Sequence, residues 1–308
     1  MLIPSSKTPP SSPYGTFDGT LFQYHKNLVA FESSRPDSLE VPQKKCILIG
    51  GLSDGLIPTP YTSKLLSVCH ENDWSLVQPL LSSSYLGFGN GSLERDSAEI
   101  ECLLKYLSSH RNATQFAMVG HSTGCQNSVH LLKHCEDKNV MKMLKLVVLQ
   151  APVSDREGAM LEANYESNIQ HARSLFDGGN GDEMMPRSSF WAPITATRFL
   201  SLQDKGGQDD FFSSDFTDEE LEEKLSHIGR YQDQGLKLLA AFSGADEYVP
   251  VHVNKEILLK RMCKAMNAKC CDDKDPVAVP LMVTHGNHNL ATDMDTFIDE
   301  IGCMMSLI

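Results

Sequence analysis

Short apolar runs alternate with longer amphipathic segments along most of the chain. From residue 44 onward, the runs have the length of buried strands, and the segments between them repeat their apolar positions with the period of a helix. In residues 92–110, for example, Ile100, Leu103 and Leu107 fall on one helical face behind the capping residue Ser92. The predicted strands are residues 46–49, 75–77, 116–119, 146–149, 238–242 and 279–283.

Continuous apolar strands separated by helices are typical of a parallel sheet that is covered on both faces. Two further strands, at residues 15–24 and 27–31, predict an antiparallel hairpin at the sheet edge, with a tight turn at residues 25–27. We therefore predict an α/β protein with a mostly parallel central sheet flanked by helices. The predicted helices are residues 61–70, 92–110, 124–134, 255–266 and 293–305.

One interval breaks this alternation. Residues 152–235 separate the sixth and seventh predicted strands by far more than the dozen or so residues of an ordinary crossover. We interpret this interval as an inserted cap over the strand ends, between core segments 14–151 and 236–308. Within it, an acidic run behind Thr217 predicts a capped helix. Residues 1–13 are rich in Ser and Pro, which predicts a disordered tail.

The composition indicates the cellular compartment of the protein and the class of partner that it binds. The net charge of -13, from 40 acidic and 27 basic residues, argues against nucleic acid or an anionic membrane surface as the main partner. No apolar run approaches the roughly 20 residues that a membrane span needs, and no signal peptide is apparent. Nine cysteines without paired metal spacing are typical of buried thiols in a reducing compartment, so we expect a cytoplasmic protein. These features leave the oligomeric state open.

A candidate nucleophile lies directly after the strand at residues 116–119. Residues 120–124 read G-H-S-T-G, and a helical pattern follows from Gly124. A strand, sharp turn and helix around a central serine form the nucleophile elbow of the α/β-hydrolase fold. We expect Gly120 and Gly124 to be required because backbone passes too close for side chains there. The sequence therefore predicts Ser122 as the nucleophile of a serine hydrolase.

A serine hydroxyl needs a base, and the base needs an acid to orient it. In this fold the acid and then the base follow the serine along the chain. Asp246, on a Gly-containing turn after the strand at residues 238–242, is the predicted acid, with Glu247 and Asp155 as alternatives. His288, in the loop after the last strand, is the predicted base, with His285 as its competitor.

The tetrahedral intermediate also needs backbone donors for its oxyanion. One predicted donor is the N-H of Thr123, directly after the nucleophile. The other is the N-H of Leu52, with Gly51 as the alternative, in the Gly-rich loop after the strand at residues 46–49. This loop lacks the G-x-G-x-x-G spacing of a dinucleotide site, so we expect no cofactor.

A metal-dependent hydrolase is also disfavoured. No HExxH motif or clustered ligand spacing occurs in the sequence. His130 and His134 lie one helical turn apart without further ligands nearby, so a pair on a helix surface is the simpler interpretation. We therefore predict no metal site.

Five motifs together resemble a eukaryotic α/β-hydrolase family typified by the fungal fusarinine C esterases. They are I-G-G-L-S-D-G-L at 49–56, S-S-Y-L-G-F-G at 83–89, G-H-S-T-G-C-Q at 120–126, G-A-D-E-Y-V-P at 244–250 and H-N-L at 288–290. The resemblance implies a Ser122, Asp246 and His288 triad and hydrolysis of carboxylic esters, which in the fungal members are the ester links of hydroxamate siderophores. Substrate identity is not carried over, because the 152–235 insert is the least similar part.

We expect the substrate to be a small-molecule ester. Its predicted contacts lie in the same motifs: Gly51, Asp54, Tyr85, Phe88 and His121. Two alternatives use the same residues. One is a binding protein of this fold that turns over little, and the other is a thioesterase or acyltransferase that works through the same acyl-enzyme.

Overall fold

The structure is a computed structural model that describes residues 14–35 and 40–308, so the predicted tail at residues 1–13 lies outside the described residues. Its strands are β1 (Gly19–His25), β2 (Leu28–Ser33), β3 (Lys44–Ile49), β4 (Trp74–Pro79), β5 (Gln115–His121), β6 (Leu144–Gln150), β7 (Lys237–Ser243) and β8 (Ala278–Val283). They form an 8-stranded sheet in the order β1-β2-β4-β3-β5-β6-β7-β8. β2 pairs antiparallel with β1 and β4, and all other neighbours are parallel. The predicted edge hairpin and parallel sheet are both present.

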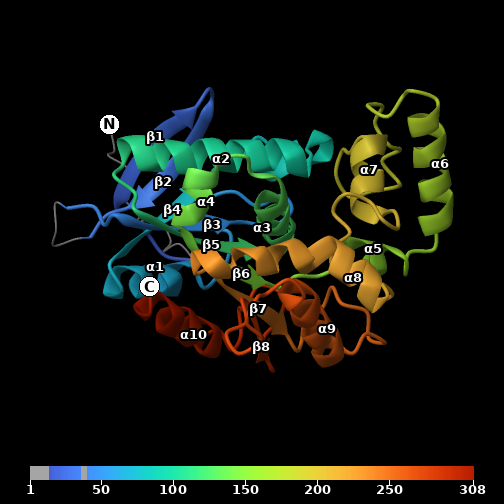
Figure 1. The fold of residues 1–308 in the computed structure, drawn as a ribbon. Coiled ribbons are helices and arrows are strands. Elements are labelled where there is room, and N and C mark those ends of the chain that lie inside the picture. The colour runs from blue at the N-terminus through green and yellow to red at the C-terminus, as the bar shows by residue number, and fades with distance from the viewer. Residues whose placement is uncertain (1–13, 36–39) are drawn as a thin grey trace, which may run out of the picture.

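Helices cover both faces of this sheet (Figure 1). One face carries α1 (Thr62–Glu71) and α10 (Asp295–Ser306). The other carries α2 (Leu93–His110), α3 (Thr123–His134), α4 (Lys138–Met143) and α9 (Lys255–Asn267). Each face has its own buried apolar cluster, so the sheet separates two cores.

The strands supply both cores by simple alternation. In β5, Phe116 and Met118 belong to the core under α2 and α3, whereas Ala117 and Val119 belong to the core under α1 and α10. Because successive side chains of a strand point to opposite faces, a strand that is buried on both faces must be apolar at every position. This is the physical reason for the continuous apolar runs in the sequence.

The edge hairpin differs from its prediction at one end. β1 begins at Gly19 instead of residue 15, because Gly15 has a φ of 95° and leaves the extended conformation. The predicted tight turn is present, and Asn27 takes a φ of 61° in it. Asn tolerates this left-handed region better than most residues.

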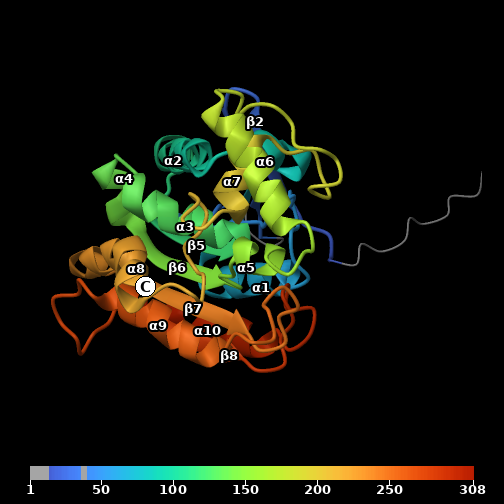
Figure 2. The ribbon, with the colours of Figure 1, turned by 90° about the vertical axis from the view of Figure 1, so that its right-hand side faces the viewer.

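The range predicted as an insert, residues 152–235, contains two differently packed parts. α5 (Asp155–Ala159), α6 (Tyr165–Asp177) and α7 (Ala196–Gln203) come first, and α6 and α7 lie beyond the carboxyl ends of the strands (Figures 1 and 2). Their apolar side chains form a third cluster together with Phe88 of the short 3-10 helix η1 (Tyr85–Asn90).

The second part returns to the sheet. α8 (Asp218–Leu225) and the 3-10 helix η2 (Ser226–Gln234) bury Leu221, Leu225 and Ile228 in the core under α3 and α9. The predicted cap of α8 is a full capping box, because Thr217 and Glu220 each accept a hydrogen bond from the other's backbone N-H. Within the described 152–235 range, α6 and α7 are therefore the helices that pack away from the sheet, in the third cluster.

Candidate active site

Ser122 occupies a strained turn between β5 and α3. Its backbone has φ 52° and ψ -120°, a combination that residues other than glycine rarely adopt. Its N-H donates to the carbonyl of Gln150 on β6 and its carbonyl accepts from Cys125, so the turn is held at both ends. The geometry lifts the Ser122 side chain above the carboxyl end of the sheet, as the elbow motif predicts.

The two glycines of the elbow permit this turn. A Cβ on Gly120 would lie 2.3 Å from the carbonyl oxygen of Gly124. A Cβ on Gly124 would lie 2.4 Å from the carbonyl oxygen of Ile49, at the end of β3. Both distances are far inside van der Waals contact, so any larger residue would push the elbow away from the neighbouring strand.

Two side chains from distant loops converge on Ser122. The Nε2 atom of His288 lies 2.9 Å from Ser122 Oγ, and His288 Nδ1 lies 2.9 Å from Asp246 Oδ2 and 3.0 Å from Oδ1. Asp246 follows β7 and His288 follows β8, so the parallel sheet brings them to one edge. The competing His285 is exposed and contacts the loop of Asp293 instead.

The two alternative acids take other positions. Glu247 accepts the backbone N-H of His288 at 2.9 Å, so it supports the loop and not the ring. Asp155 accepts a hydrogen bond from the Gln126 side chain at 3.3 Å. Asp246 is thus the acid next to the His288 ring.

Gln150, at the end of β6, joins these loops and was not predicted. Its Nε2 donates to the carbonyl of His288 at 2.9 Å, and its Oε1 accepts from His121 Nδ1 at 2.6 Å. The side chain is fully buried. It therefore fixes the backbone of His288 relative to the elbow. The sequence signal that could have identified Gln150 was its polar amide at the end of an otherwise apolar strand.

His121 is buried behind the nucleophile. Burial, and next the nearby charge of His288 when protonated, lower the pKa of His121 to about 3. Because Gln150 Oε1 can only accept, the proton of the neutral His121 ring is on Nδ1. His121 is therefore a neutral supporting residue of the elbow. It does not line the neighbouring pocket.

The Gly-rich loop after β3 lies beside Ser122. A Cβ on Gly51 would lie 2.9 Å from Ser122 Cβ. The N-H of Gly51 donates to Asp54 Oδ2 at 2.7 Å, so it is already engaged. Within residues 14–35 and 40–308, the N-H groups of Leu52 and Thr123 have no such partner. These are the two donors that the sequence predicts for an oxyanion.

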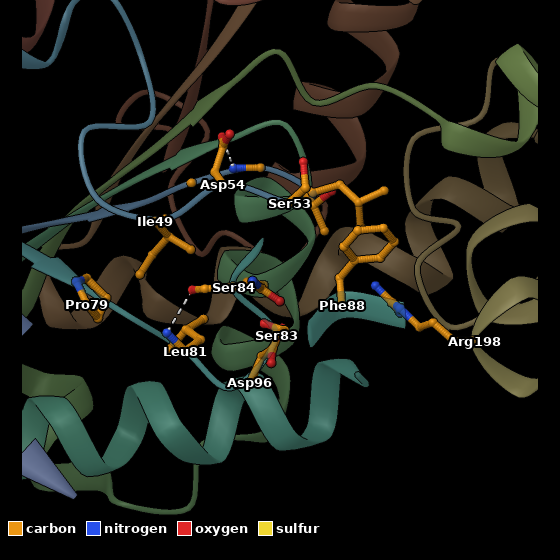
Figure 3. Close-up of a pocket in the computed structure, with 16 residues that line it drawn as sticks. Ile49, Ser53, Asp54, Pro79, Leu81, Ser83, Ser84, Phe88, Asp96 and Arg198 are labelled. Atoms are coloured by element: carbon orange, nitrogen blue, oxygen red, sulfur yellow. Dashed lines mark hydrogen bonds between the residues drawn. The ribbon is translucent and has the colours of Figure 1, made fainter. Parts of the chain in front are cut away.

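A pocket opens on the side of this loop (Figure 3). Gly51, Asp54 and Phe88 line it, as three of the five predicted substrate contacts. Tyr85 lines a different groove. Its ring also lies against Gly55, which lines the first pocket.

Three polar residues of this pocket were missed: Asp96, Asn127 and Arg198. Asp96 lies one helical turn before Ile100, on the apolar face of α2. A carboxylate on an apolar face was a signal that could have identified it. Asn127 and Arg198 had no comparable signal, because only the fold brings α3 and α7 together.

The two histidines of α3 pack against each other and against a neighbouring helix. The rings of His130 and His134 stack with centroids 4.2 Å apart, and His130 Nδ1 lies 2.8 Å from Ser97 Oγ. Among the described residues, no cluster of three or more His, Cys, Asp or Glu is arranged to hold a metal ion. None of the helices in the described ranges is long and apolar enough to cross a membrane.

Comparison with known sequences places this geometry among related proteins. A family described as "Protein of unknown function (DUF1749)" matches residues 5–298. The chain is 33% identical over 263 residues to the UPF0613 protein PB24D3.06c of Schizosaccharomyces pombe, covering 79% of this chain and 82% of the relative. It is 32% identical over 305 residues to the fusarinine C esterase sidJ of Aspergillus fumigatus, covering 81% and 83%. The resemblance predicted from the five motifs is confirmed.

Solved structures show the same architecture. The siderophore hydrolase EstB of Aspergillus fumigatus superposes with a TM-score of 0.77 and 27% identity, over 96% of this chain and 99% of its own. An α/β-hydrolase fold protein of unknown function superposes with a TM-score of 0.65 at 15% identity, over 94% and 96% of the two chains. The predicted α/β-hydrolase fold is therefore confirmed.

Proposed function

Because this chain belongs to the family described as protein of unknown function (DUF1749) and has esterases among its relatives, we propose that it hydrolyses carboxylic esters through an acyl-enzyme on Ser122. It is a carboxylesterase-type hydrolase. The observation that carries the proposed mechanism is the continuous hydrogen-bonded chain from Ser122 Oγ through His288 to Asp246, with contacts of 2.9 Å on each side of the ring.

In the proposed acylation step, His288 Nε2 accepts the proton of Ser122 as Oγ attacks the ester carbonyl carbon. Asp246 holds the Nδ1-H of His288 and stabilises the imidazolium that forms. The oxyanion accepts hydrogen bonds from the N-H groups of Leu52 and Thr123. The C-O bond to the alcohol then breaks, and His288 donates its Nε2 proton to the departing alkoxide.

The proposed deacylation step repeats this sequence with water. His288 Nε2 takes a proton from a water molecule, whose oxygen attacks the acyl carbon. Collapse of the second intermediate breaks the bond to Ser122 Oγ, which regains its proton from His288. The carboxylic acid leaves and the free enzyme is restored.

The setting proposed for this reaction is the cytoplasm, with a small-molecule ester as substrate. All nine cysteines have free thiols, which supports a reducing compartment. The net charge of -13 supports a soluble ester as partner in preference to nucleic acid.

A fluorophosphonate probe tests the nucleophile. We expect the probe to label the protein, and Ser122→Ala to abolish labelling and to lower ester hydrolysis by about 10⁴-fold or more. Ser67→Ala, which removes an exposed hydroxyl on α1, is the matched control and should behave like the natural protein. Labelling that persists in Ser122→Ala would overturn the proposal.

The type of acyl transfer is tested with matched substrates. Oxygen and thiol esters of the same acid, each with and without an added alcohol, separate hydrolysis from thioester cleavage and from acyl transfer. We expect faster release of acid from the oxygen ester. Preferred turnover of the thiol ester, or transfer of the acyl group to the alcohol, would contradict ester hydrolysis as the main reaction.

A further inference from the structure

A buried polar cluster lies next to the nucleophile, on the side of the predicted oxyanion donors. Asp96 of α2, Asn127 of α3 and Arg198 of α7 line the same pocket as Leu52 and Thr123. Figure 3 shows Asp96 on α2 and Arg198 entering from the α7 side beside Phe88. Three helices that are distant in the sequence therefore direct polar groups to one place.

Each of these buried side chains carries one polar atom that has no partner among the described residues. Asp96, Asn127 and Arg198 are 4%, 4% and 3% exposed. Within the described part of the chain, Asp96 Oδ1, Asn127 Oδ1 and Arg198 Nε have no hydrogen bond, and neither does Oγ1 of Thr123, which lines the same pocket. Buried polar atoms are nearly always paired because an unpaired one is costly, so several around one cavity indicate a site that is completed by a ligand.

The cavity limits the size of that ligand group. Its volume is about 30 Å³, which is room for about two water-sized groups. Phe88 closes it on the side of α6 and α7. Only a small substituent of a substrate fits there.

The position of His288 determines which half of an ester faces the cavity. His288 must donate a proton to the departing alcohol, so the alcohol half lies on the side of His288. Neither His288 nor Asp246 lines the cavity, whereas Thr123 and Leu52 do. The cavity therefore faces the acyl half.

The Thr123 hydroxyl can donate or accept, whereas the other three unpaired atoms have fixed roles and select the chemistry of the substituent. Asp96 Oδ1 and Asn127 Oδ1 accept hydrogen bonds, whereas Arg198 Nε donates one. A hydroxyl donates one hydrogen bond and can accept two, so it can accept from Arg198 Nε and donate its proton to one of the two acceptors at a time. An ammonium cannot accept and would face the Arg198 charge, a carboxylate would face Asp96, and a methyl group would leave all three atoms unpaired.

The charges around the cavity are consistent with this selection. Arg198 Nη1 is already paired with Asp209 Oδ2 at 2.6 Å, whereas its Nε has no partner among the described residues. Burial raises the pKa of Asp96 to about 6, against the opposing effects of Ser83 and Arg198. Asp96 therefore acts as an acceptor at neutral pH.

We propose that the substrate is an ester whose acyl half carries a hydroxyl group close to the carbonyl, bound by Asp96, Asn127 and Arg198. This inference rests on the proposed ester hydrolysis at Ser122. It adds a substrate class, short hydroxyacyl esters, to the reaction.

The test compares lactate, 3-hydroxypropanoate, propanoate and alaninate esters of one alcohol. We expect kcat/KM for at least one hydroxyacyl ester to exceed that for propanoate by about tenfold or more. Asp96→Asn and Asn127→Leu should bring this ratio close to one. Glu94→Gln, which removes an exposed carboxylate from the same helix, should leave the ratio unchanged.

Fluorophosphonate labelling of Ser122 distinguishes failure of the proposed hydroxyl site from failure of the proposed ester hydrolysis. Equal turnover of hydroxyacyl and propanoate esters by a protein that is labelled would overturn the hydroxyl site while leaving the proposed hydrolysis intact. Preference for alaninate would also overturn it. Absence of both labelling and turnover would overturn the proposed function and with it this inference. The ratio of kcat/KM between hydroxyacyl and propanoate esters is measured on the natural protein. The test therefore gives a result even if a variant fails to fold.

Discussion

The two sides of Ser122 differ in how their polar atoms are paired. On the side of His288, both ring nitrogens, the backbone N-H and the carbonyl of this residue all have partners, and Asp246 is 3% exposed with both oxygens engaged. On the side of Asp96, four buried residues of the described chain have an unpaired atom: Asp96, Thr123, Asn127 and Arg198. The first side has the fixed arrangement that the proposed proton transfer requires, whereas the second has free atoms that the proposed substrate hydroxyl would bind. Proton transfer needs fixed geometry, and recognition needs free hydrogen-bonding capacity.

The largest expected effect comes from breaking the paired side. His288→Ala should lower kcat/KM by about 10⁴-fold or more, because no other group accepts the Ser122 proton. His285→Ala is the matched control and should stay within about twofold, since His285 is exposed and away from the nucleophile. Steady-state hydrolysis of one ester measures both. Comparable losses in the two variants would show that the assigned base is wrong.

A smaller effect should appear in stability when the unpaired side is changed. The pKa of Asp96 is raised to about 6, so folding disfavours its charged form, and this unfavourable contribution grows as pH rises from about 4 to 6. Asp96→Asn should therefore raise the free energy of unfolding by about 3 kcal/mol at pH 7. The gain should shrink toward zero near pH 4.

Urea unfolding at the two pH values measures this difference, with Glu94→Gln as the control of equal charge change. A destabilised Asp96→Asn at pH 7 would mean that Asp96 is paired in solution. The two sides of Ser122 would then not differ in the pairing of their polar atoms. A stabilised variant that also loses substrate preference would identify Asp96 as a group kept for binding at a cost in stability.

The smallest effect concerns His121, on the paired side. Its pKa is lowered to about 3, so its contribution to stability is present above the ordinary pKa of about 6.5 and is lost as pH falls toward 3. The natural protein loses unfolding free energy when the pH falls from 7.5 to 5.5. This loss should be smaller in His121→Gln by about 1 kcal/mol.

The control is His25→Gln, in the exposed hairpin turn, which should keep the natural pH dependence. His227, whose pKa is also lowered by burial, to about 4, contributes in the same range, so each variant is compared with the natural protein at every pH. An unchanged slope in His121→Gln would show that the ring is hydrated in solution.

Sequence patterns were sufficient for features that depend on neighbouring residues. The strands were predictable because burial on two faces makes them continuously apolar, and the elbow because Gly120 and Gly124 must avoid backbone that passes close by. The order of Asp246 and His288 after Ser122 follows from the strands that carry them. These features are local or follow directly from the topology.

The polar cluster could not be predicted in the same way. Arg198 and Asn127 meet only because α7 and α3 pack on either side of one cavity, and no spacing in the sequence records this. The split of the predicted insert was equally hidden, since α8 resembles any acidic amphipathic helix until its apolar face is seen against α9. Long-range packing determined both.

The apolar cluster of α6 and α7 has an evolutionary consequence. It is separate from the two cores that border the sheet, and apart from Phe88 its buried members belong to residues 169–202. Because this cluster is separate, we expect substitutions there to alter the wall above the pocket without moving β5, β7 or β8, which position the proposed triad. Relatives that share the reaction can therefore differ in substrate preference. Each lineage can change this one segment while it keeps the same catalytic residues.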